Sequence, residues 1–217
     1  ARAQQKPFMY IVNDGYQLQR LVGELNLFAP ELRLAVFPDY EVLPYERQSP
    51  YNELIAERLR TLWQVQHKQI DILLVQATTL QMLLPPQDYF AQRVLLVKIG
   101  DRLDSEQLRS QLTVSGYQCV HQVYEAGEFA IRGSIIDILP MGSKQAIRID
   151  LFDDEVDSIQ YFATKTQLVT ESISEVEILP SREYPHDIQN VRLMAARFAE
   201  YFPKQADSNL AKDLKNN

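Results

Sequence analysis

Short apolar runs recur through the first part of the chain. The run from Phe8 to Val12 precedes turn residues at 13–15 and predicts a buried strand. Similar runs over residues 32–37 and 72–75 predict two further strands.

Helical periodicity fills the stretches between these runs. Apolar side chains recur at spacings of three and four residues over 18–25 and again over 54–63, with Asn52 as the expected cap of the second helix. Buried strands that alternate with amphipathic helices are typical of a parallel sheet covered on both faces. We therefore expect residues 1–86 to form the first part of an α/β domain.

The pattern changes after residue 86. One helix is predicted from a cap at Asp104 to a stop near Gly116, a residue type common just past a helix end. From about 118 to 179, strand-like runs are divided at short intervals by glycine and aspartate turns, which favours antiparallel pairing. Residues 87–179 are therefore expected to form an inserted β-rich (α+β) domain.

The last part of the chain is predicted to return to the first domain. Apolar residues at helical spacing between 188 and 202 form one stripe, so residues 180–202 are expected to include a helix that packs back on the α/β domain. Residues 203–217 are polar and are expected to be a tail or a truncated linker.

Strict alternation over residues 147–152 separates two faces of a predicted strand. The core face receives Ile147, Ile149 and Leu151, so Arg148, Asp150 and Phe152 share the opposite face. Arginine and large aromatic residues are over-represented among the residues that dominate binding at protein interfaces.

The strand predicted over 128–132 carries a further arginine. Alternation places Arg132 opposite Phe129 and Ile131. If the two strands are neighbours, Arg132, Arg148 and Phe152 form one compact patch. In the alternative interpretation, the arginines pair with Asp150 or Glu128 and Phe152 covers a second, minor core.

The charge of the chain disfavours nucleic acid as a direct ligand. With 22 Lys and Arg against 29 Asp and Glu, the formal net charge is −7. Binding to phosphate backbones normally requires a basic stripe, and no such stripe is present in the sequence.

Motifs for catalysis and cofactors are also missing from the sequence. No glycine precedes a lysine, so there is no phosphate-binding loop of the GxxxxGK type, and neither GxGxxG nor GxSxG occurs. His67, His121 and His186 lack the spacing of zinc ligands, and the acidic cluster at 153–157 is interpreted as a hairpin turn. We expect no catalytic residue, metal site or cofactor in this chain.

Cysteine content and hydropathy favour the cytoplasm. The single Cys119 excludes an internal disulfide framework and is interpreted as a buried structural thiol. No run of 18 apolar residues is available to span a membrane, and the first six residues do not resemble a signal peptide.

Four segments give the chain a specific resemblance. In order and spacing they are similar to the N-terminal region of bacterial transcription-repair coupling factor (Mfd), and to the first part of the excision-repair protein UvrB. The segments are Gly127-Glu128-Phe129-Ala130-Ile131-Arg132-Gly133, Ile136-Asp137-Ile138-Leu139-Pro140, residues 148–158 (RIDLFDDEVDS), and residues 37–45 (FPDYEVLPY) with Ser49-Pro50.

This resemblance implies a fold and a binding surface. It implies a degenerate helicase-like parallel α/β domain with an inserted antiparallel β-rich domain that binds the repair protein UvrA. The family's contact surface carries arginines and a phenylalanine at positions that match Arg132, Arg148 and Phe152, with Glu128 and Asp150 as further candidates.

The resemblance also implies the role of the chain in a larger protein. It implies a non-catalytic adaptor of a bacterial cytoplasmic protein that recruits UvrA to stalled RNA polymerase, with the same surface covered by the parent's own C-terminal domain. The parent resembles an ATP-dependent DNA translocase, in which ATP, Mg, RNA polymerase and DNA are contacted by other domains. Two alternatives remain: a DNA-binding accessory domain of a helicase or translocase, and a nucleotide hydrolase whose phosphate loop precedes this sequence.

Overall fold

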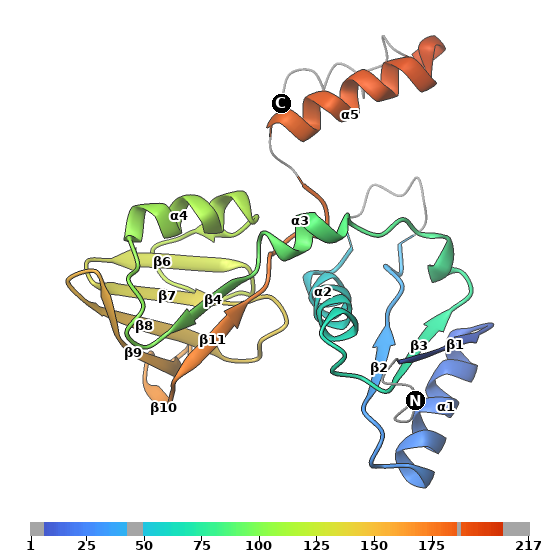
Figure 1. Cartoon of the computed structure of the whole chain (residues 1–217), viewed down its shortest axis with the longest axis horizontal. Helices are drawn as coiled ribbons and strands as arrows, with labels where there is room; N and C mark the ends of the chain where they lie inside the picture. Colours follow the sequence, from blue (N-terminus) through green and yellow to red (C-terminus); the bar gives the residue numbers. More distant parts are fainter. Residues whose placement is uncertain (1–6, 43–49, 186–187, 206–217) are drawn as a thin grey trace.

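The computed structural model describes residues 7–42, 50–185 and 188–205. They form an N-terminal α/β unit, a β-rich unit and a C-terminal helix (Figure 1). Residues 43–49, which include part of the proline-rich block, lie outside the described residues, as do His186 and positions 206–217 of the polar tail.

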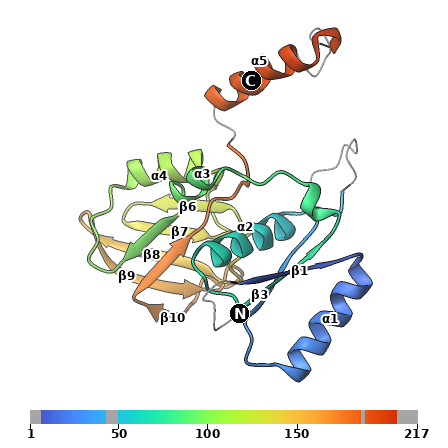
Figure 2. The ribbon, with the colours of Figure 1, turned by 45° about the vertical axis from the view of Figure 1, so that its right-hand side comes forward.

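The N-terminal unit is built on a three-stranded parallel sheet. Strands β1 (Phe8–Val12), β3 (Ile72–Gln76) and β2 (Leu34–Phe37) lie in the order β1-β3-β2. Helix α1 (Gly15–Phe28) and helix α2 (Asn52–Gln66) pack on opposite faces, because alternate residues of β3 join different cores (Figure 2). The predicted parallel α/β arrangement is confirmed.

Strand β1 corrects one expectation about burial. It was predicted to be a buried strand, but four of its five residues, Phe8, Met9, Tyr10 and Ile11, are about half exposed. Both β1 and β2 are edge strands, but β2 contributes Ala35 and Phe37 to a buried core, whereas β1 contributes Val12. An apolar run predicts a strand but not the number of neighbours that cover it.

The β-rich unit contains a six-stranded sheet in the order β10-β9-β8-β7-β6-β5. Its strands are β5 (Gln118–Cys119), β6 (Glu128–Arg132), β7 (Ile135–Leu139), β8 (Ala146–Phe152), β9 (Glu155–Phe162) and β10 (Val169–Ile173). All neighbouring pairs are antiparallel except β5 and β6.

One face of this sheet is covered by α4 (Ser105–Val114) and by a two-stranded sheet of β4 (Leu95–Lys98) and β11 (Glu175–Ile178) (Figure 1). The short helix α3 (Gln87–Ala91) precedes β4, and the 3-10 turn η2 (Thr79–Gln81) follows β3. The shared core contains Leu108, Leu112, Phe129, Ile136, Ile138, Ile147, Ile149 and Ile159.

Two local predictions are wrong and one is confirmed. Asp104 caps α4 as predicted, since its carboxylate accepts from the amides of Glu106 and Gln107. Asn52 is instead the first residue of α2, after an N-cap at Tyr51 that makes no side-chain capping bond. Cys119 is exposed rather than buried, because it lies on the two-residue edge strand β5.

A buried ion pair joins α2 to the segment that follows β11. The guanidinium of Arg58, fully buried, bonds both carboxylate oxygens of Glu183 at 2.9 Å and the carbonyl of Pro38 at 2.7 Å. The same carboxylate accepts the hydroxyl of Tyr40 at 2.6 Å, and the guanidinium lies over the rings of Phe37 and Tyr40. This cluster fixes the exit from the β-rich unit against the α/β unit.

The predicted C-terminal helix is present as α5 (Ile188–Tyr201), followed by the 3-10 turn η3 (Pro203–Gln205). In both views α5 lies apart from the N-terminal sheet (Figures 1 and 2). The return of the chain to the α/β domain stays a prediction, and so do the domain boundaries at residues 86 and 179. No helix in the described ranges has the length and hydropathy needed to cross a bilayer.

Candidate functional site

The outer face of the six-stranded sheet brings two of the predicted residues together. Arg132 ends β6 and Arg148 lies in the middle of β8, and β7 runs between these strands. The predicted compact patch assumed that these two strands are direct neighbours, and they are not. The residue that connects them is Asp137 of β7, which stands in register with Arg148.

Asp137 binds both arginines. Its Oδ1 accepts from Nε of Arg148 at 2.7 Å, and its Oδ2 accepts from Nη2 of Arg148 at 2.9 Å. The same Oδ2 forms an ion pair with Nη2 of Arg132. With only 1% of its surface exposed, this carboxylate lies beneath the two guanidinium groups.

Arg148 is held on three sides. Its Nη2 also donates to the side-chain oxygen of Gln167 at 3.2 Å, and its guanidinium carbon lies 4.6 Å from the centre of the Phe162 ring. The hydrogen bonds to Asp137 raise the pKa of Arg148 further above its usual value, so the side chain carries a permanent positive charge. The side chain retains 19% exposure.

Arg132 is the more accessible of the two arginines. Its side chain is 44% exposed, and its Nη1 donates to the carbonyl of His121 at 2.9 Å. Arg132, Arg148 and Asp137 carry one formal positive charge between them, and Asp150, on the same face of β8 and close enough to act on Arg148, offsets it.

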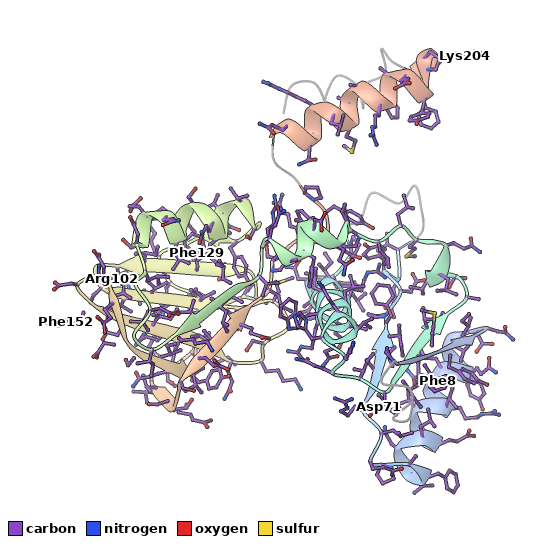
Figure 3. All side chains as sticks on the ribbon, in the orientation of Figure 1. Phe8, Asp71, Arg102, Phe129, Phe152 and Lys204 are labelled. Carbon is purple, nitrogen blue, oxygen red and sulfur yellow. The ribbon has the colours of Figure 1, made fainter. Side chains whose placement is uncertain are left out.

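Phe152 is the exposed aromatic residue of the same surface. It is 74% exposed at the end of β8 and points away from the sheet beside the tip of the β8–β9 hairpin (Figure 3). The amide of Leu151 bonds the carbonyl of Ser134 at 3.0 Å, which places this end of β8 beside the β6–β7 turn that follows Arg132. The alternative that Phe152 covers a minor core is wrong.

The other predicted residues have different partners. Glu128 accepts from the amides of Tyr124 and Glu125 at 2.8 and 2.9 Å, and Asp150 accepts from the Ser134 hydroxyl at 3.2 Å. The direct ion pairs of Arg132 and Arg148 are formed with Asp137 instead, although Asp150 lies close enough to Arg148 to raise its pKa.

Sequence reasoning missed the role of Asp137, although a signal was available. In the run Ile136-Asp137-Ile138 the two isoleucines are fully buried in the core, so alternation puts the carboxylate on the outer face. A charged residue inside an apolar strand needs a partner of opposite charge. The signal gives the face but not the identity of that partner.

The turn between β1 and α1 lies after the first strand, whereas the nucleotide alternative places its phosphate loop ahead of this sequence. In phosphate-binding α/β folds the helix N-terminus that follows a strand binds the anion. Here Asp14 caps α1 and accepts the amide of Gln17 at 2.8 Å, while Gln17 accepts the amide of Asn13 at 3.0 Å. A carboxylate already bound at this position would repel a phosphate, which disfavours nucleotide binding there.

Comparison with known proteins assigns the β-rich unit to a family. Residues 95–184 match the model of the UvrB interaction domain. This range contains every residue of the surface formed by Arg132, Asp137, Arg148 and Phe152, which we call the arginine surface.

Relatives of known name cover nearly the whole chain. It is 41% identical over 186 residues to the transcription-repair-coupling factor of Haemophilus influenzae, 35% over 201 residues to that of Escherichia coli, and 32% over 178 residues to that of Bacillus subtilis. These matches cover 86%, 93% and 82% of this chain, but only 16%, 17% and 15% of the relatives. The chain therefore belongs to the transcription-repair-coupling factor family, as a segment about one sixth of the length of these relatives that carries a UvrB interaction domain.

Proposed function

We propose that this chain is the adaptor region of a transcription-repair coupling factor, and that it binds the excision-repair protein UvrA through the arginine surface. Through this contact the parent protein recruits UvrA to RNA polymerase stalled on DNA in the bacterial cytoplasm. RNA polymerase and DNA are contacted by other parts of the parent, and its C-terminal domain covers the arginine surface before UvrA binds.

The observation that carries the proposal is the combination of a rigid charged cluster with an exposed aromatic side chain. Binding energy at protein interfaces concentrates in a few Arg, Tyr and Trp or other large anchors set in well-packed surroundings. Arg132 and Arg148 are held by Asp137 on a hydrogen-bonded sheet, and Phe152 projects from the same face at the end of β8 with 74% exposure. Such a surface is suited to binding a protein rather than to catalysing a reaction.

Phe152→Ala tests this surface most directly. Because the ring is exposed, its removal leaves folding intact, while loss of an anchor costs about 2 kcal/mol of binding, roughly 30-fold in Kd. Affinity for purified UvrA, measured by calorimetry, is expected to fall by that factor with an unchanged unfolding temperature.

Phe28→Ala is the matched control for this experiment. Phe28 is also an exposed phenylalanine, but it ends α1 in the α/β unit, outside the β-rich unit that carries the arginine surface. The control is expected to bind UvrA as the unchanged chain does. Equal losses in both variants, or no loss in Phe152→Ala, would exclude the arginine surface as the contact.

A further inference from the structure

We propose that Asp137 is the positioning residue of the arginine surface: it fixes both guanidinium groups before the partner arrives and so determines which of their donors the partner meets. This inference rests on the proposed function. It concerns how the surface is prepared for binding, and Asp137 itself is too deeply buried to contact a partner.

The register of the sheet lets one carboxylate reach two arginines. Asp137 lies directly opposite Arg148 on one side and Ala130 on the other. Because Ala130 has only a methyl group, the space above it is open to Arg132, which lies two residues further along the same strand. Such diagonal cross-strand neighbours are within reach of a long side chain.

The contacts of Asp137 leave particular donors for a partner. Asp137 takes Nε and Nη2 of Arg148, and Gln167 takes Nη2 as well. The two Nη groups of Arg132 are bonded to His121 and Asp137. A guanidinium has five N–H donors, so the protein acceptors within the part of the chain that the structure describes leave two donors on Nη1 of Arg148 and three on Arg132 for a partner.

The chemistry of the complementary surface follows from this arrangement. Two arginines over one carboxylate present several free N–H donors, with Asp150 and the Phe152 ring on the same outer face of β8. The arrangement fits a partner segment that offers a carboxylate or backbone carbonyl beside an apolar pocket. Preorganised side chains lose less conformational entropy on binding, which strengthens the contact without adding to its area.

Asp137→Asn tests the positioning role. The amide keeps the shape of the carboxylate but removes its charge and turns one acceptor into a donor, which opposes either Nε of Arg148 or the Nη2 groups of both arginines. We expect affinity for UvrA to fall about tenfold, mainly through faster dissociation measured by surface plasmon resonance, because related complexes differ mostly in their off-rates.

Asp71→Asn provides a matched control. Asp71 is also a buried carboxylate that binds an arginine at two points, with Arg33 Nε at 3.1 Å and Nη2 at 3.0 Å, but it lies in the α/β unit (Figure 3). This variant loses a comparable pair, and its affinity for UvrA is expected to stay within about twofold of the unchanged chain. A tenfold loss here would show that loss of any buried pair weakens binding, and would overturn the inference.

A double-mutant cycle separates positioning from a general structural effect. In a chain that already carries Arg132→Ala and Arg148→Ala, adding Asp137→Asn is expected to change the residual affinity less than about twofold, because the residues through which Asp137 acts are gone. A further loss as large as in the unchanged background would mean that Asp137 acts through the sheet instead.

Nuclear magnetic resonance of the unchanged chain gives a test that does not depend on variants. Fixed guanidinium groups are expected to show dispersed Nε and Nη signals for Arg132 and Arg148 with slow rotation about the Nε–Cζ bond. Averaged signals in the free chain would overturn the positioning role even if Asp137→Asn failed to fold.

The two proposals fail differently. If Phe152→Ala weakens UvrA binding while folded Asp137→Asn binds normally, the surface is correct and the positioning role is wrong. If neither changes binding, the arginine surface is not the contact and both proposals fail.

Discussion

At the residue scale, the chain contains two clusters in which a buried carboxylate binds arginine, and we expect them to have different roles. Arg58 and Glu183 hold the α/β unit to the segment that leaves the β-rich unit, and both are buried. Asp137 with Arg132 and Arg148 lies at the surface of the sheet, where the arginines are partly exposed. The first cluster is expected to act on stability and the second on recognition.

Loss of Glu183 is expected to destabilise the fold. In Glu183→Ala the guanidinium of Arg58 stays buried without a counter-charge, and breaking such a pair typically costs about 3–5 kcal/mol. The hydroxyl of Tyr40 also loses its acceptor, and burial together with that hydrogen bond raises the pKa of Tyr40 well above its usual range. Urea unfolding measures the loss.

Glu175→Ala is the comparison for that loss. Glu175 pairs with Lys98 at 2.6 Å, but both side chains are about half exposed. Exposed pairs contribute about 0–1 kcal/mol. If the two variants lost equal stability, the buried cluster of Arg58 and Glu183 would not stabilise the fold more than an exposed ion pair does.

At the element scale, the end of α4 shows how local sequence and tertiary packing combine. The amide of Tyr117 bonds the carbonyl of Leu112, and the amide of Gly116 bonds that of Thr113, which is the Schellman pattern. Gly116 adopts a φ of +94°, a conformation that other residues rarely adopt. The predicted stop near Gly116 is therefore confirmed.

Gly116→Ala is expected to destabilise the β-rich unit by about 1–3 kcal/mol, the usual range for a strained backbone. Its new methyl group would lie 2.6 Å from Cγ of Arg182 and 2.8 Å from Oγ of Ser181, in addition to the strain of positive φ. By contrast, Gly23→Ala in α1 has no atom within 4 Å and is expected to stabilise the chain by about 0.5–1 kcal/mol. Thermal unfolding of both variants would reveal opposite shifts, and equal shifts would contradict this account.

At the scale of the whole molecule, charge separates protein binding from DNA binding. The two arginines of the arginine surface are offset by Asp137 and by the nearby Asp150, on a chain whose formal net charge is −7. Neutralising several phosphates requires a comparable number of cations, which this surface does not offer.

The chain is therefore expected not to bind duplex DNA at ~150 mM salt, so the fluorescence anisotropy of a labelled duplex should stay unchanged when the chain is added. The same sample should bind UvrA. Salt-sensitive binding to duplex DNA that is lost in Arg132→Ala would favour the alternative of a DNA-binding accessory domain.

Much of the fold followed from local pattern. The periods of about 3.6 and 2 residues predicted the helices, the parallel sheet and the β-rich unit, because side-chain direction is tied to backbone geometry within each element. Alternation likewise placed Arg148 and Phe152 on the outer face of β8, as observed. The resemblance in residues 127–158 predicted the family for the same reason: its motifs are continuous in the chain.

What only the tertiary structure decided concerns residues far apart in sequence. Strand order places β7 between β6 and β8 and so makes Asp137 the partner of Arg132 and Arg148. It also places β1 at an edge of its sheet, where four of its residues are about half exposed. Strand order is set by how whole elements pack on a shared core, so the hydrophobic periodicity within one segment does not predict it. The sequence by itself determined which side chains point outward, whereas the tertiary structure decided which of them meet.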